Sequence, residues 1–132
     1  MATPAKRSFR LTGATGSPVA VEVTSGGGQR PVAVLCGPFK PGLAERLARA
    51  GFAVVSFAPP GAPGLEIVLD ALGRGVLDVD ADSYALIEPR DDGSIALARA
   101  AAGVRVPGLV VGDMPVDLAA AAIVRWLAKH LV

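Results

Sequence analysis

Four runs of mainly apolar residues, each about the length of a β-strand, most constrain what this chain can fold into. The runs are residues 31–36 (Pro-Val-Ala-Val-Leu-Cys), 52–57, 83–87 and 104–111. The first three show little alternation of apolar and polar residues, which is typical of strands covered on both faces. Because helix-like segments separate the runs, the pattern predicts an α/β fold, a three-layer sandwich with a mostly parallel sheet.

Helices are expected over residues 42–50, 65–77, 93–102 and 117–131. The first is followed by Gly51, a typical helix stop, and the second is ended by Gly73 and Gly75. The last helix is predicted to open at Asp117 as its N-cap, because an aspartate at this position can accept hydrogen bonds from backbone N–H groups. The segment 93–102 can also be drawn as the second strand of a hairpin, but its alanine-rich end favours a helix.

An N-terminal hairpin is predicted from two β-prone runs, residues 8–12 and 19–24, on either side of a turn at 13–16. The second run carries valines at alternate positions, Val19, Val21 and Val23. The segment 58–64 is too rich in proline and glycine for a helix or a strand and is predicted to be a loop. Pro107 predicts a late start or an edge position for the last strand.

The 132 residues are enough for one domain, residues 1–132, with a small core. Apolar residues make up 52% of the chain and the mean hydropathy is +0.49, whereas aromatic residues make up 5%. A small domain has too little interior for so much apolar surface. We therefore expect a homodimer, or a protein partner on an apolar surface, with the final helix as the candidate surface.

Charge and cysteine content exclude several classes of partner. The formal net charge of +1 predicts no attraction to nucleic acid or to a membrane surface. The single cysteine, Cys36, excludes an internal disulfide and a multi-cysteine metal site, and no cofactor or metal is expected. The N-terminus lacks the apolar run of a signal peptide, and no apolar stretch is long enough to cross a membrane. We expect a cytoplasmic protein.

The order of these segments resembles the first two-thirds of an α/β-hydrolase. Residues 43–61 (Leu-Ala-Glu-Arg-Leu-Ala-Arg-Ala-Gly-Phe-Ala-Val-Val-Ser-Phe-Ala-Pro-Pro-Gly) are similar to that family's first helix, next strand and glycine-containing loop. Residues 84–97 (Tyr-Ala-Leu-Ile-Glu-Pro-Arg-Asp-Asp-Gly-Ser-Ile-Ala-Leu) resemble the strand, sharp turn and helix that carry the nucleophile. The resemblance implies a truncated, minimal core of that fold.

The turn that carries the nucleophile departs from the family pattern. In the family it reads Gly-x-Ser-x-Gly, because the turn packs tightly against its neighbours. Here the matching positions are Glu88-Pro-Arg-Asp-Asp92, so Arg90 stands at the serine position. Arginine stays protonated in water and cannot act as a nucleophile. The sequence therefore predicts that the protein is not a conventional serine hydrolase.

The family's catalytic histidine also has no counterpart. In the family it lies in the loop before the last helix, and here that loop is Gly112-Asp-Met-Pro-Val116. The only histidine of the sequence, His130, falls in the final turn of the last helix, where hydrogen bonding to helix carbonyls is its simpler role. No Ser-His-Asp triad can be assembled from this sequence.

Charged residues that follow two of the predicted strands form the candidate site. Glu88, Arg90, Asp91 and Asp92 follow one strand, and Asp113 follows the next. The carboxyl ends of parallel strands meet at one edge of a sheet, where open α/β sheets bind ligands. There Arg90 and Asp91 can hold a small organic or anionic ligand. The alternative is a surface salt-bridge cluster that caps a turn.

Cys36 ends the first apolar run and is a further ligand-binding candidate at the same edge. The sequence Cys-Gly-Pro-Phe is similar to a thioredoxin active site, but Phe39 takes the place of the second cysteine, so a buried structural role is the alternative. Residues 78–82 (Asp-Val-Asp-Ala-Asp) begin like a calcium loop. They are predicted to form a charged turn, because Ser83 and Pro89 replace the glycine and acidic residue that calcium requires.

A second resemblance stays open. If residues 84–99 form a hairpin, the chain resembles the thioredoxin-like C-terminal domain of flavin-dependent aromatic hydroxylases, which is about this size.

Two functions are compatible with the sequence. The first is a degenerate α/β-hydrolase-like protein that acts as a non-hydrolytic, dimeric binding or accessory module. The second is a small-molecule enzyme, of hydrolase, lyase or isomerase type, in which Glu88, Arg90 and Asp113 act as acid, base or anion clamp.

Overall fold

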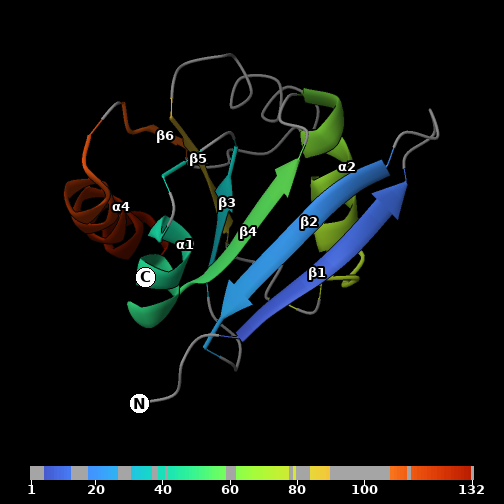
Figure 1. Ribbon diagram of the computed structural model, residues 1–132, viewed down its shortest axis with the longest axis horizontal. Helices are drawn as coiled ribbons and strands as arrows, with labels where there is room; N and C mark the ends of the chain where they lie inside the picture. The colour runs from blue at the N-terminus through green and yellow to red at the C-terminus, as the bar shows by residue number, and fades with distance from the viewer. Residues whose placement is uncertain are drawn as a thin grey trace.

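The structure, a computed structural model, describes residues 5–12, 18–26, 31–36, 39–40, 42–58, 62–77, 79, 84–89, 108–112 and 114–131. In this part of the chain the strands are β1 (Ala5–Thr12), β2 (Pro18–Ser25), β3 (Val32–Leu35), β4 (Ala53–Ala58), β5 (Tyr84–Glu88) and β6 (Gly108–Val110). The helices are α1 (Leu43–Arg49), α2 (Ala62–Gly73) and α4 (Val116–Leu131). Figure 1 shows their arrangement.

The six described strands form one mixed sheet in the order β1-β2-β4-β3-β5-β6. β1 and β2 pair antiparallel, in register from Ala5 opposite Ser25 to Thr12 opposite Pro18, and β2 also runs antiparallel to β4. The pairings of β4 with β3, β3 with β5, and β5 with β6 are parallel. The predicted N-terminal hairpin and the mostly parallel α/β sheet are therefore confirmed.

Strand β5 has a parallel neighbour on each side. Along Leu86 and Ile87, β3 lies on one edge and β6 on the other. Both edges are thus taken by parallel strands, an arrangement that the hairpin alternative for residues 84–99 does not predict. Residues 93–102, where a helix is expected, lie outside the described residues, as do residues 80–82 of the predicted charged turn.

The sheet separates two hydrophobic clusters, one on each face. The cluster beneath α2 includes Val34, Val55, Leu65, Val68 and Leu72. The cluster beneath α1 and α4 includes Ala33, Leu47, Val54, Ile123 and Leu127. Successive residues of the central strands enter the two clusters in turn, which explains why these strands are apolar throughout. Figure 1 shows α1 and α4 on one side of the sheet and α2 on the other.

The helix stops predicted from glycine are confirmed by backbone geometry. Gly51, after α1, has a φ of 107° and donates its N–H to the carbonyl oxygen of Ala48 over 3.1 Å. Gly75, after α2, has a φ of 76° and donates its N–H to the carbonyl oxygen of Leu72 over 3.2 Å. Because glycine alone adopts these angles at little cost, each one ends its helix in a left-handed turn.

Helix α2 begins earlier than the sequence predicts. Its first residue is Ala62, so the last part of segment 58–64, expected to be a loop, is helical. Pro63 is compatible with this position because the first turn of a helix uses no backbone N–H in its own hydrogen bonds. The prediction of a loop was wrong for residues 62–64.

Helix α4 also begins one residue earlier than predicted, at Val116. The carbonyl oxygen of Pro115 accepts a hydrogen bond from the N–H of Ala119 over 2.9 Å, so Pro115 precedes the first helical residue. Asp117 therefore lies in the first turn, not at the N-cap, and forms an ion pair with Arg46 of α1.

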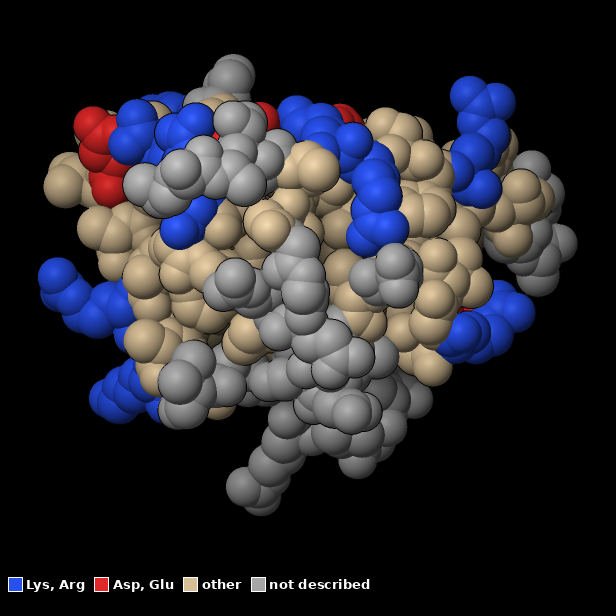
Figure 2. Space-filling model, turned by 90° about the horizontal axis from the view of Figure 1, so that it is seen from below, with Lys and Arg blue, Asp and Glu red and all other residues tan. Residues whose placement is uncertain are grey.

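Figure 2 shows the molecule from the side where β3, β4 and β5 begin, and there Lys and Arg side chains are scattered among uncharged residues. β6 lies at an edge of the described sheet, as Pro107 predicts. None of the described helices combines the length and the apolarity needed to cross a membrane. The candidate site lies at the carboxyl ends of β3 and β5, away from the side that Figure 2 shows.

Candidate functional site

The candidate site lies where β3 and β5 end side by side. Glu88 is the last residue of β5, and Cys36 directly follows β3. The N–H of Cys36 donates a hydrogen bond to the carbonyl oxygen of Ile87 over 2.8 Å, which joins the two strand ends. Glu88 has no exposed surface and Cys36 is 2% exposed. Two of the predicted site residues therefore meet at this edge, and both are buried.

Cys36 and Glu88 also share one face of the sheet. Val34 lies opposite Leu86 in the register of β3 and β5, and both belong to the cluster beneath α2. Side chains alternate along a strand, so two residues further on Cys36 and Glu88 lie opposite each other on the same face. The Cys36 thiol donates to the carbonyl oxygen of Val34 over 3.6 Å. The sequence predicts that Cys36 and Glu88 lie at the same edge of the sheet. Their position on the same face depends on the register of β3 and β5, which the sequence does not give.

The burial of Glu88 needs a specific explanation. Removing a carboxylate from water costs several kcal/mol unless polar partners compensate, so buried acids are uncommon in cores. The other residues of β5, Tyr84 to Ile87, are apolar or aromatic and are counted in the two hydrophobic clusters. The hydrophobic pattern of β5 thus ends on a buried acid at the edge where α/β sheets bind ligands.

The hydrogen bonds that pair β5 with β6 continue beyond the two strands as far as Pro89 and Gly112. The N–H of Val111 donates to the carbonyl oxygen of Glu88 over 2.8 Å, and the N–H of Gly112 donates to that of Pro89 over 3.2 Å. Gly112 has a φ of 81°. Arg90, Asp91, Asp92 and Asp113 lie outside the described residues. In the sequence, Arg90 and Asp113 directly follow the hydrogen-bonded residues Pro89 and Gly112.

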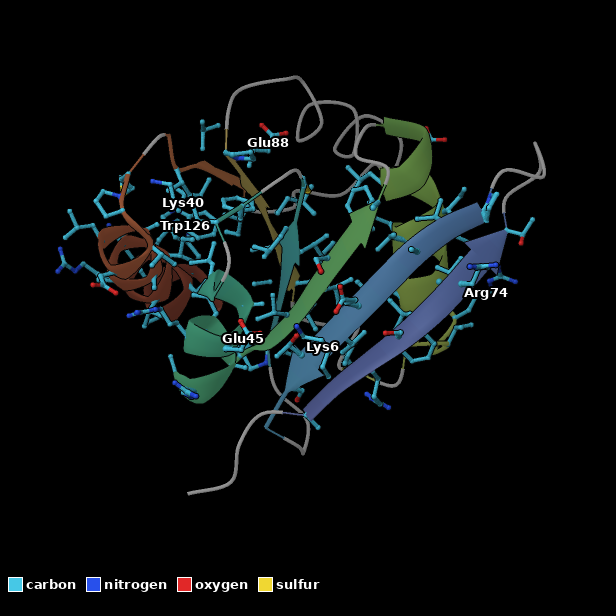
Figure 3. All side chains as sticks on the ribbon, viewed as in Figure 1. Lys6, Lys40, Glu45, Arg74, Glu88 and Trp126 are labelled. Carbon is cyan, nitrogen blue, oxygen red and sulfur yellow. The ribbon has the colours of Figure 1, made fainter. Side chains whose placement is uncertain are left out.

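His130 belongs to a different part of the molecule. It is exposed in the last turn of α4, with its ring centroid 4.6 Å from that of Trp126. Helix α4 ends beside α1, whereas Glu88 lies towards the other end of the strands (Figures 1 and 3). The fold therefore separates the histidine from the sheet edge, as the sequence predicts.

Comparison with known proteins identifies the fold. The sequence matches no protein-family model and no curated protein. Among solved structures, dienelactone hydrolase from Anabaena variabilis matches with a TM-score of 0.65 at 10% identity, over 99% of this chain and 100% of the hydrolase. Carboxyl esterase 2 from the fungus Tuber melanosporum matches with a TM-score of 0.64 at 17% identity. Esterase LipW from Mycobacterium marinum matches with a TM-score of 0.59 at 22% identity.

This chain has an α/β-hydrolase-like fold. It spans about half the length of the two esterases: the match covers 85% of this chain and 46% of the fungal enzyme, and 97% of this chain and 54% of LipW. Of the two resemblances seen in the sequence, the first is therefore confirmed at the level of the fold. The comparison is at the level of the fold, so the match of Glu88 to the first glycine of the family's nucleophile turn stays a prediction from the sequence.

A second group of polar side chains lies on the other face of the α/β-hydrolase-like sheet, between α1 and the hairpin. A pocket of about 280 Å³ opens there. Its polar lining comes from three strands, the β3–α1 loop and α1, and consists of Lys6, Glu22, Thr24, Lys40, Glu45 and Ser56. This group is not predicted from the sequence, because its members are far apart in the chain. The available signal was the polar face of β2, opposite its valines.

Lys6 connects two walls of this pocket. Its Nζ lies 3.6 Å from Oε2 of Glu22 on β2 and 3.2 Å from Oε1 of Glu45 on α1. The hydrogen bond to Glu45 raises the pKa of Lys6. A hydrogen bond from its own backbone N–H, together with Lys6, lowers the pKa of Glu45. Figure 3 shows Lys6 and Glu45 approaching each other from β1 and α1.

Proposed function

We propose that this α/β-hydrolase-like protein is a non-hydrolytic binding or accessory module that holds a small organic or anionic ligand at the carboxyl edge of β3, β5 and β6. The observation that carries the proposal is the fully buried Glu88, which the sequence resemblance matches to a glycine of the family's nucleophile turn. Arg90 follows in place of the serine, and His130 lies elsewhere in the fold. A serine nucleophile with its base is not expected from this arrangement.

The hydrogen bond between Pro89 and Gly112 supports a ligand site at this edge. It joins the two segments that continue into Arg90 and Asp113, so the proposed site draws on both. A guanidinium group binds carboxylates and phosphates through paired hydrogen bonds, which makes Arg90 the proposed anchor for an anionic group. Asp91 and Cys36 complete the proposed ligand-binding set. We place the protein, as a homodimer, in the cytoplasm.

Reaction with generic esters and with a fluorophosphonate probe tests the missing hydrolase mechanism. We expect ester hydrolysis at the rate of the buffer alone and no covalent labelling, while an active serine esterase labels fully under the same conditions. The variant Arg90→Ser is also expected to stay inactive, because it restores neither the flanking glycines nor a histidine. Labelling of the wild-type chain at any residue would contradict the proposal.

Ligand binding is tested by thermal unfolding with a panel of small carboxylates and phosphates. A ligand at about 100 times its Kd stabilises the folded state by about 2.7 kcal/mol. We expect a member of the panel to raise the Tm of the wild-type protein and of Arg74→Gln, a control in the exposed Asp70–Arg74 ion pair, but not of Arg90→Gln. Equal shifts for the three proteins would exclude Arg90 as the anchor.

The alternative is an enzyme that uses Glu88, Arg90 and Asp113. The observation that favours it is the position of a buried carboxylate opposite the Cys36 thiol, because buried acids can serve in proton transfer. The variant Glu88→Gln separates the two functions. Turnover of a small lactone or ester that Glu88→Gln abolishes, without loss of ligand-induced stabilisation, would establish the enzyme in place of the binding module.

A further inference from the structure

The pocket between α1 and the hairpin is lined by apolar residues, here called the floor, and by polar residues, here called the walls. Leu35, Phe39 and Leu43 contribute apolar surface, and Thr24 and Ser56 contribute hydroxyl groups. Its volume of about 280 Å³ is slightly below the range of about 300–1,000 Å³ that is typical of small-molecule sites. The pocket therefore has room for one small ring and not for a large cofactor.

The polar walls offer donors and acceptors in close proximity. Lys6 can only donate hydrogen bonds, and the ionised side chains of Glu22 and Glu45 can only accept them. The hydroxyl groups of Thr24 and Ser56 can do both. A ligand group that meets all of these requirements must itself both donate and accept, and a hydroxyl group does so.

The charges around the pocket favour a neutral ligand. Its lining contains two lysines, Lys6 and Lys40, and two glutamates, Glu22 and Glu45, so the formal charges cancel. A net anion or cation would be attracted by one pair and repelled by the other. Charge-assisted hydrogen bonds to uncharged hydroxyls carry no such penalty.

The polar walls are also organised before a ligand binds. Lys6 bridges Glu22 of β2 and Glu45 of α1, so one ammonium group orients two carboxylates from different elements. Groups that are already oriented lose less conformational entropy on binding. Thr24, which also lines the pocket, is 2% exposed, so the surrounding residues restrict the motion of its side chain.

We propose that this pocket binds a neutral polyhydroxylated ligand of the size of a single sugar ring, with its hydroxyl groups on Glu22, Glu45 and Thr24 and its C–H face on the apolar floor. The site is separate from the carboxyl edge around Glu88, and it lies on the other face of the sheet. The proposal therefore does not depend on the function proposed above.

Titration of the ¹⁵N-labelled protein by NMR tests this inference with the wild-type chain. The probes are three neutral compounds, methyl β-D-glucopyranoside, myo-inositol and glycerol, and two charged ones, glucuronate and glucosamine. We expect at least one neutral ring compound to shift the amide signals of Thr24, Glu45 and Ser56, and to bind more tightly than either charged sugar. No shift at these amides from any neutral probe, or tighter binding of a charged sugar, would overturn the proposal.

Two matched variants test the assigned contacts. Glu22→Gln, in the pocket, is expected to weaken binding of the neutral probe about fivefold, because a neutral amide oxygen replaces the charged acceptor in one hydrogen bond. Glu66→Gln, on α2 at the other face, is expected to leave the affinity unchanged. Equal affinities for both variants would remove Glu22 from the site and contradict the assignment. The wild-type titration does not depend on the folding of either variant.

Discussion

At the scale of residues, one buried polar side chain lies in each of the two proposed sites. Among the described residues, Glu88 and Thr24 are the polar or charged side chains with almost no exposure. Glu88 ends β5 on the face of α2, and Thr24 lies on β2 in the pocket beside α1. Apolar residues would fill both positions at lower desolvation cost. Each of these residues therefore indicates a requirement other than core packing.

The Lys6–Glu45 pair predicts a small loss of stability in acid. The folded-state pKa of Glu45 is lowered by its own backbone N–H and by Lys6, so its contribution is complete above the unfolded-state pKa. That contribution is lost as the pH falls through the lower, folded-state pKa. Because both side chains are well exposed, solvent screens the interaction and the effect is small.

Urea unfolding at neutral pH and near pH 3 measures this effect. The wild-type protein is expected to lose more stability over this interval than Glu45→Gln, whose side chain does not titrate. Lys6→Gln is expected to lose an intermediate amount, because the backbone hydrogen bond of Glu45 remains. An identical acid dependence for Glu45→Gln and the wild-type protein would refute the assignment.

At the scale of elements, local rules explain the helix ends better than the helix starts. The stops after α1 and α2 follow from single glycines with positive φ. The starts of α2 and α4 both differ from the prediction, and both lie next to proline. Proline is compatible with a loop and with the first turn of a helix, so the residue type alone does not distinguish them.

Two alanine substitutions at the end of α2 test the role of the backbone. Gly75 has a φ of 76°, and Gly73 is the last helical residue; at both positions an added Cβ would have no neighbouring atom within 4 Å. Gly75→Ala is expected to destabilise the protein by about 1 kcal/mol through backbone strain. Gly73→Ala is expected to be neutral or to stabilise by up to about 1 kcal/mol. Chemical unfolding measures both, and equal effects would contradict the assigned stop at Gly75.

At the scale of the whole molecule, the exposed apolar side chains point to where association is expected. Val110 on β6 is 44% exposed and Leu118 on α4 is 61% exposed. Both flank the loop that connects the edge strand of the described sheet to α4. An exposed leucine beside an edge strand is a feature that a homodimer contact would cover.

Light scattering after size exclusion tests the homodimer that we propose. We expect a mass of about twice 13.3 kDa for the wild-type protein, and a monomer for Leu118→Asp, because a buried unpaired charge would destabilise the contact. Val76→Asp is the control, since Val76 is 46% exposed after α2 on the other face. A wild-type mass of one chain at all concentrations would contradict the proposal.

The sequence by itself determined the strands and the helix stops, and it predicts that the family's serine turn is absent. Apolar runs such as Val32–Leu35 indicate a strand that is buried on both faces. Gly51 and Gly75 indicate positions where the backbone needs a positive φ to end a helix. Residues 88–92, which the resemblance matches to the family's nucleophile turn, contain no serine. These features are local, so a short window of sequence contains the whole physical reason for each of them.

Only the tertiary structure decided which distant residues meet. The register of β3 and β5 sets Cys36 opposite Glu88, and the packing of α1 against the hairpin brings Glu45 to Lys6. Strand order and register depend on the fit of side chains far apart in the chain, and a shift of one residue would turn every side chain to the other face. The sequence predicts an acid at the sheet edge, but the burial of Glu88 and its neighbours are set by the fold.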